Sequence, residues 1–201
     1  MLRAFVHRLV ALPWIYDTVQ FIVGSPLVFR RLVPILQKLA PRAVIVDLGG
    51  GTGLVRRFCP LRCKYICVDM DLKKLHEHRR RHAQGLLIVG DVTRAPIKTL
   101  SVDATLCTNM SHHLGDEALI GLVRESRRIL KDSGFLLFVD AIWNPARLVG
   151  RLLWKYDRGA NPRTSETLYS TLSGSLRVVE QQRIAVYHEY ALFVGTKPNP
   201  S

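Results

Sequence analysis

The sequence predicts an α/β fold in which a doubly wound, largely parallel sheet carries helices on both faces. Residues 44–48 are typical of a buried parallel strand, because apolar and β-branched residues bracket one carboxylate and a glycine run follows at once. From residue 64 to residue 140, short apolar segments alternate with segments of helical periodicity, as the crossover connections of such a sheet require. Two β-rich segments, 176–187 and 189–197, close the chain.

Residues 1–40 precede the first strand and are predicted to be helical. Apolar residues recur there at helical spacing, and Ser25 followed by Pro26 is typical of a helix start. The high apolar density fits a helical cover over a site. It also fits an amphipathic segment on a membrane surface, because basic residues such as Arg30 and Arg31 accompany the apolar face. The two interpretations are compatible with each other.

The first strand runs into the glycine-rich stretch 49–53, which predicts a tight turn that opens a helix. The G-x-G-x-x-G spacing of dinucleotide-binding turns fails in each register, because Thr52, Leu54 and Arg56 occupy required glycine positions. The spacing that fits is D-x-G-x-G-x-G, beginning at Asp47. We expect that carboxylate to lie beside a cationic ligand, since it would repel a diphosphate.

A second strand is expected at 64–69 and ends in an acid, Asp69. An acidic side chain at this point can accept hydrogen bonds from both hydroxyls of a ribose. Met70 would then lie flat against an adenine, and Asp71 would cap the next helix. That helix carries the basic run 73–82, which fits either a solvated helix face or an anion-binding patch.

Further strands are expected at 85–91, 102–109 and 134–140, and the first of them ends in Gly90-Asp91. His112 and His113 follow the strand at 102–109, and Asp140 ends the strand at 134–140. These three residues are the candidates for a catalytic base, and a structural role is the alternative for each. Helices are expected at 116–131, where Ser133-Gly134 would end the helix, and at 147–156 and 164–173.

The composition limits the kinds of partner and the cellular compartment that we expect for this protein. A net charge of +13 indicates nucleic acid, anionic lipid or an acidic substrate as partner, or simply a soluble basic protein. We expect no transmembrane helix and no signal peptide, and therefore a cytoplasmic protein, with peripheral membrane attachment as an alternative. The cysteines match neither zinc nor iron–sulfur spacing, so we expect reduced thiols and no metal at Cys59, Cys63, Cys67 and Cys107.

Residues 42–140 resemble the core of the type 11 class I S-adenosylmethionine (SAM) methyltransferases, the group that includes ubiquinone and menaquinone C-methyltransferases. The resemblance rests on the turn at 47–53, Asp69, Gly90-Asp91, the strand with Asp103, and the helix–glycine–strand stretch 128–137. It implies a Rossmann-like doubly wound seven-stranded sheet with an antiparallel C-terminal hairpin and an N-terminal helical cover.

The resemblance divides one domain, 1–201, into a lid at 1–40, a SAM-binding core at 42–140, and substrate-side helices with the last two strands at 141–201. The candidates for substrate contact lie on covering elements and are Tyr16, Tyr156 and Asp157. SAM is the implied cofactor. Its implied contacts are Asp47, Gly49, Gly50, Gly51, Gly53, Asp69, Met70, Asp91, Val92 and Asn109.

The apolar N-terminal segment favours a small, hydrophobic or lipid-like methyl acceptor. An RNA or protein acceptor, favoured by the net charge, and a non-catalytic SAM-binding protein are the alternatives. Against nucleic acid, the sequence has no appended recognition domain and no aromatic–basic interleaving of the kind used for base stacking.

Overall fold

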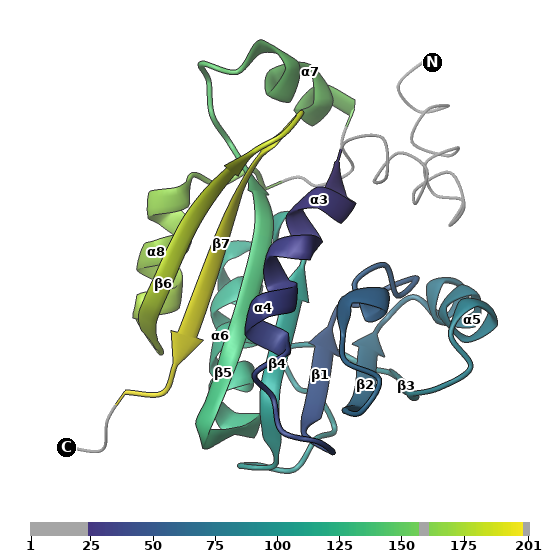
Figure 1. The fold of residues 1–201 in the computed structure, drawn as a ribbon. Coiled ribbons are helices and arrows are strands. Elements are labelled where there is room, and N and C mark those ends of the chain that lie inside the picture. Colours follow the sequence, from purple (N-terminus) through teal and green to yellow (C-terminus); the bar gives the residue numbers. More distant parts are fainter. Residues whose placement is uncertain (1–23, 157–160, 199–201) are drawn as a thin grey trace.

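The computed structural model describes residues 24–156 and 161–198. Within these ranges, strands form one mixed seven-stranded sheet in the order β3-β2-β1-β4-β5-β7-β6 (Figure 1). Strands β1 to β5 pair in parallel, whereas β7 runs antiparallel to both β5 and β6. The doubly wound sheet and its antiparallel C-terminal hairpin are therefore confirmed. The strands are β1 (Val44–Leu48), β2 (Lys64–Asp69), β3 (Leu86–Val89), β4 (Val102–Thr108), β5 (Leu130–Ile142), β6 (Arg177–Ala185) and β7 (Glu189–Thr196).

Helices cover both faces of the sheet, and each face has its own apolar core (Figure 1). On one face, α3, α4 and α5 pack against the sheet through residues such as Phe29, Leu36 and Leu75. On the other face, α6 and α8 pack through residues such as Leu122 and Leu168. The described helices are α3 (Ser25–Phe29), α4 (Val33–Leu36), α5 (Leu72–Arg81), α6 (Asp116–Ile129), α7 (Leu148–Tyr156) and α8 (Ser165–Ser173), with 3₁₀ turns η1 (Arg30–Leu32), η2 (Arg56–Phe58) and η3 (Ser111–His113).

The prediction of an α-helix directly after the glycine turn is wrong. Only the 3₁₀ turn η2 forms between β1 and β2. It ends at Phe58, and the next residue, Cys59, has the extended angles φ −80° and ψ 140°. Pro60 prevents the turn from continuing as a helix, because a proline disfavours the helical conformation in the residue before it and cannot itself donate a backbone hydrogen bond. The turn therefore receives no α-helix dipole.

The expected end of α6 at Ser133-Gly134 is also wrong. The helix ends at Ile129 and β5 begins at once with Leu130. The register between β4 and β5 shifts near the start of β5, so that Ser133 and Gly134 lie within an irregular part of the strand. A Cβ on Gly134 would lie 3.0 Å from the carbonyl oxygen of Val102, so glycine permits this close approach of two strands.

Candidate functional site

The glycine turn adopts the backbone conformation that its composition predicts. Gly49, Gly51 and Gly53 have φ values of 78°, 50° and 79°. The amide of Gly49 donates to the carbonyl of Val68 at 2.8 Å, and the amide of Gly51 donates to Asp69 Oδ2 at 2.9 Å. These two hydrogen bonds fix the turn to the end of β2, where Asp69 lies.

The three glycines serve different purposes. Gly49 and Gly51 line a cavity, and an L side chain at either would be strained by the positive φ. Gly53 is not among the lining residues, because it faces the ring of His78, whose nearest atom would lie 2.8 Å from an added Cβ. Gly53 therefore has a packing role here, and its direct contact with a cofactor stays a prediction. The His78 ring is fully buried, and burial lowers its pKa to about 4, so it packs there as a neutral ring.

Asp47 does not lie where a carboxylate beside a cationic ligand would lie. It is fully buried beneath the turn and does not line the cavity. The Tyr65 hydroxyl donates to Asp47 Oδ2 at 2.5 Å. Burial raises the pKa of Asp47 to about 7. The hydrogen bond from Tyr65 acts to lower this pKa, and the nearby charge of Asp69 acts to raise it further. Asp47 therefore supports the turn from below.

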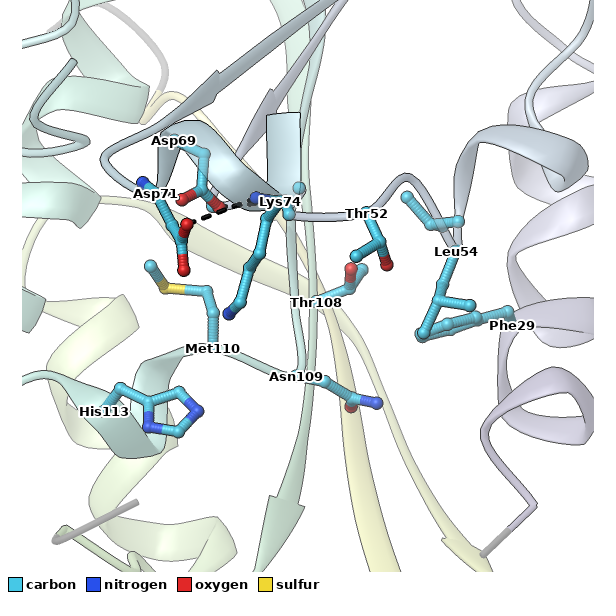
Figure 2. A pocket seen from close by; sticks show the side chains of 14 residues that line it. Phe29, Thr52, Leu54, Asp69, Asp71, Lys74, Thr108, Asn109, Met110 and His113 are labelled. Carbon is cyan, nitrogen blue, oxygen red and sulfur yellow. Dashed lines mark hydrogen bonds between the residues drawn. The ribbon is translucent and has the colours of Figure 1, made fainter. Parts of the chain in front are cut away.

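Two adjacent cavities meet at the turn. The first, of about 260 Å³, lies over the turn and the carboxyl end of β4 (Figure 2). The second, of about 620 Å³, lies between the ends of β2 and β3 and the start of α6. Gly49, Asp69 and Met110 line both. The second cavity is also lined by Met70, Asp91, Val92, Thr93, Arg94, Leu114, Glu117, Ala118 and Gly121.

The acidic residues at the strand ends are held in fixed orientations. Asp69 Oδ1 accepts from the amide of Asp71 at 2.8 Å, while Oδ2 accepts from Gly51. Asp91 Oδ1 accepts from the amide and hydroxyl of Thr93, both at 2.8 Å, and these hydrogen bonds lower the pKa of Asp91. Both carboxylates line the second cavity at the positions that the sequence predicts, with Met70 exposed beside Asp69.

The three candidate base residues lie together at η3. Asp140 is buried, and its carboxylate accepts hydrogen bonds from the amides of Ser111 and His112 at 2.7 and 3.2 Å and from the Ser111 hydroxyl. Asp140 Oδ1 also lies 2.6 Å from His112 Nδ1. Burial alone would raise the pKa of Asp140, but the neighbouring His112 and the hydrogen bonds from Ser111 and Ala141 hold it below its usual value.

Of these residues, only His113 lines the first cavity (Figure 2). The rings of His112 and His113 lie 4.3 Å apart, centroid to centroid, and His112 is buried. Asp140 and His112 are therefore arranged to position the η3 turn, while His113 faces the space in which reacting groups would lie. Asn109 also lines this cavity, with φ 51°, and its Nδ2 donates to Ser25 Oγ at 3.1 Å, linking β4 to α3.

The substrate candidates cannot be placed in the same way. Tyr16 and Asp157 lie outside the described residues. Tyr156 is the last residue of α7, and its side chain is also outside the description.

The structure adds site residues that the sequence did not single out. Lys74 reaches from α5 into the first cavity, and Phe29 and Leu54 close the side opposite Met110 and His113 (Figure 2). Arg163 holds η3 from outside, because its guanidinium donates to the carbonyls of Ser111 and Leu114 and to the Asp116 carboxylate. Lys74 belongs to the basic run 73–82. Residues three apart lie on the same side of a helix, so the spacing between Lys74 and the cap Asp71 could have predicted that Lys74 faces the cavity.

The comparisons with known proteins agree with this geometry. Residues 46–138 match the family model described as Methyltransferase domain. The probable S-adenosylmethionine-dependent methyltransferase of Mycobacterium tuberculosis H37Rv is 32% identical over 114 residues, or 54% of this chain and 40% of that protein. An uncharacterized methyltransferase of Mycobacterium sp. strain JLS is 26% identical over 100 residues, or 49% of this chain and 39% of that protein. The chain thus spans about two fifths of the length of these curated relatives.

Solved structures share the fold. Geranyl diphosphate C-methyltransferase of Streptomyces coelicolor A3(2), in complex with Mg²⁺, geranyl diphosphate and S-adenosyl-L-homocysteine, has a TM-score of 0.71 at 14% identity, covering 87% of this chain and 79% of that one. A chain from the complex of the Haloferax volcanii Trm112 methyltransferase activator with a methyltransferase has a TM-score of 0.76 at 16% identity, covering 98% and 99%. At these identities the likeness establishes the fold.

Fold and site define a Rossmann-like α/β domain whose two cavities lie at the carboxyl ends of its strands, where folds of this kind bind nucleoside cofactors. Residues 46–138 are similar to a methyltransferase domain, and the relative from Mycobacterium tuberculosis H37Rv is named as a probable S-adenosylmethionine-dependent methyltransferase. The residues present fit SAM: an added Cβ at Gly51 would project into the cavity, 3.4 Å from Lys74 Cδ and 3.8 Å from Asp69 Oδ2. The cavity beyond Asp69 offers Met70, Val92 and Leu114 as apolar walls and Asp91 as an acceptor.

Proposed function

We propose that this protein transfers the methyl group of SAM to a small, apolar or lipid-like acceptor. The observation that carries the proposal is the apolar part of the first cavity, which Phe29, Leu54, Val55 and Met110 form beside the glycine turn and the polar side chains at the strand ends. Apolar side chains grouped in this way can orient the apolar part of an acceptor. The isoprenoid substrate named for the Streptomyces coelicolor neighbour belongs to the same chemical class, and so does the quinone precursor that the type 11 resemblance suggests.

Bound SAM supplies an electrophilic methyl carbon on its sulfonium. The protein then has to hold the cofactor, orient the acceptor and receive a proton where the acceptor loses one. In this proposal Asp69 accepts from the ribose hydroxyls, Met70 and Val92 contact the faces of the adenine, and Asp91 accepts from its amino group. The support is that all four residues line the second cavity. His113 is the proton acceptor in this proposal, because it lines the first cavity while His112 is bound to Asp140.

The basic surface gives less support to an RNA or protein acceptor. In α5, Arg80 and Arg81 both donate to Glu77 at 2.6–2.9 Å, and Arg79 donates to the carbonyls of Ala83 and Gly85. These guanidinium groups therefore stabilise the helix and the turn that follows it. Such pairing favours the interpretation of this run as a solvated helix face.

The test is to incubate the full chain with SAM carrying a labelled methyl group and a cell extract, and to separate apolar lipids, water-soluble small molecules, RNA and protein. We expect label in the apolar fraction. A Gly51→Val variant should give none, because the side chain obstructs the cavity. Label in RNA or protein would overturn the proposed acceptor class. Label in no fraction, with SAM binding intact, would indicate a non-catalytic protein.

A further inference from the structure

Helix α7 presents an apolar face to solvent. Leu148, Val149 and Leu152 are 74%, 52% and 57% exposed. On the opposite side, Trp154 is buried and its Nε1 donates to the carbonyl of Ile142 at 3.4 Å. The helix is therefore docked through one side, while large aliphatic side chains on the other side stay in water. Because exposed aliphatic side chains clustered on one helix face are a usual mark of an interaction site, this face needs a partner.

Two cations border this apolar face. Arg151 and Lys155 are one helical turn apart, so they lie side by side, and α7 contains no acidic residue. With Leu148 and Leu152 they line an open hollow of about 610 Å³ whose other walls include Trp143. An apolar strip bordered by basic side chains matches the boundary between the headgroups and the acyl chains of an anionic lipid layer.

The β6–β7 turn extends the same surface. Arg147, just before α7, donates to the carbonyl of Val186 at 2.6 Å, so the turn lies against the start of the helix. The next residue, Tyr187, is 58% exposed. Figure 1 places α7 and this turn at the same end of the sheet. An exposed tyrosine suits the depth of lipid headgroups, because its ring is apolar and its hydroxyl is polar.

This surface adjoins the site. The ring of Trp154 lies 5.6 Å from that of His112, centroid to centroid, and the amide of Asn161 donates to the carbonyl of His112 at 3.0 Å. A membrane that touched the outer face of α7 would therefore lie near the η3 turn. No helix in the described ranges is long and apolar enough to cross a bilayer, so the contact would be interfacial.

We propose that α7 and the β6–β7 turn dock this protein on an anionic lipid surface, with Leu148, Leu152 and Tyr187 entering the headgroup region and Arg151 and Lys155 contacting lipid phosphates. A second copy of the chain fits this face less well. A two-fold contact through α7 would bring the same two cations of both copies together. The inference does not depend on methyl transfer, because lipid binding is measured without SAM.

The test is sedimentation of the full chain with phosphatidylcholine vesicles, with and without phosphatidylglycerol. We expect binding only to anionic vesicles, and release at high salt. Reversing both charges in Arg151→Glu/Lys155→Glu should weaken binding by at least roughly thirtyfold, since each basic residue near such a surface contributes about a factor of five. Leu148→Glu/Leu152→Glu should weaken it by at least roughly tenfold.

Matched controls carry the same changes elsewhere. Leu61→Glu alters an aliphatic side chain that is 80% exposed, and Arg124→Glu/Arg127→Glu reverses two exposed charges on α6. Both should bind vesicles more tightly than either α7 variant, and all variants should keep wild-type melting temperatures. Wild-type binding by the α7 variants would overturn the proposal and assign any lipid contact to another surface. Equal binding to neutral vesicles, no binding by the wild type, or dimerisation that the α7 leucine substitutions abolish would also overturn it.

Discussion

Replacing Asp47 by asparagine should change how stability depends on pH. Burial raises the pKa of this carboxyl from 3.8 to about 7 in the folded protein. The folded state therefore favours the protonated acid, whereas the unfolded chain ionises at the lower value. Stability from this group is fully present below pH 4 and is lost as pH rises through 7. Since one pKa unit corresponds to about 1.4 kcal/mol, the loss can reach roughly 4 kcal/mol.

Asparagine has nearly the same shape and can still accept the hydrogen bond from Tyr65. It cannot ionise, so Asp47→Asn should lack this dependence. The assay is urea unfolding of both proteins at several values between pH 4 and pH 8. The free energy of unfolding of the wild type, minus that of the variant, should fall steadily across this interval.

The control is Asp132→Asn, whose side chain is 88% exposed. The difference between the wild type and this control should stay nearly constant from pH 4 to pH 8. A difference between the wild type and Asp47→Asn that was equally flat would refute the reasoning, because it would mean that burial does not raise the pKa of Asp47.

Two further substitutions test the turn and the η3 pair. Gly51→Val should abolish SAM binding in calorimetry while circular dichroism stays unchanged, whereas Gly115→Val, whose added Cβ meets nothing within 4 Å, should bind normally; unchanged affinity in Gly51→Val would remove the turn from the site. Asp140→Asn should lower the free energy of unfolding in urea at pH 7 by about 2 kcal/mol, because Ser111 and His112 lose a buried charged acceptor; a loss no larger than that of Asp132→Asn would contradict the positioning role.

The strand segments and the acids at their ends could be predicted from sequence because they depend on local patterns. Apolar runs that end in Asp69 and Asp91 identify strands, and parallel connectivity brings their carboxyl ends to one edge of the sheet. The direction in which Asp47 points could not be predicted. A strand buried on both faces has no polar alternation that assigns its side chains to a ligand or to the core.

Other features depend on contacts between residues far apart in the sequence. The glycine at 53 is needed because His78, on α5, packs against it, and the motif alone does not separate this requirement from ligand contact. Arg163 reaches back to Asp116 and to the carbonyl of Ser111 through tertiary structure. The early end of the segment after the glycine turn, in contrast, has a local cause. Pro60 disfavours the helical conformation at Cys59, and this could have been predicted from the sequence.

We expect Asp69 and the glycine turn to hold SAM, and titration calorimetry of SAM into the wild type and into Asp69→Asn measures this. The wild type should bind SAM and S-adenosylhomocysteine and should not bind NAD. The variant should lose at least about 1.4 kcal/mol, a tenfold drop in affinity, because the ribose hydroxyls lose a charged acceptor. NAD binding tighter than SAM binding, or equal SAM affinity in both proteins, would contradict the account.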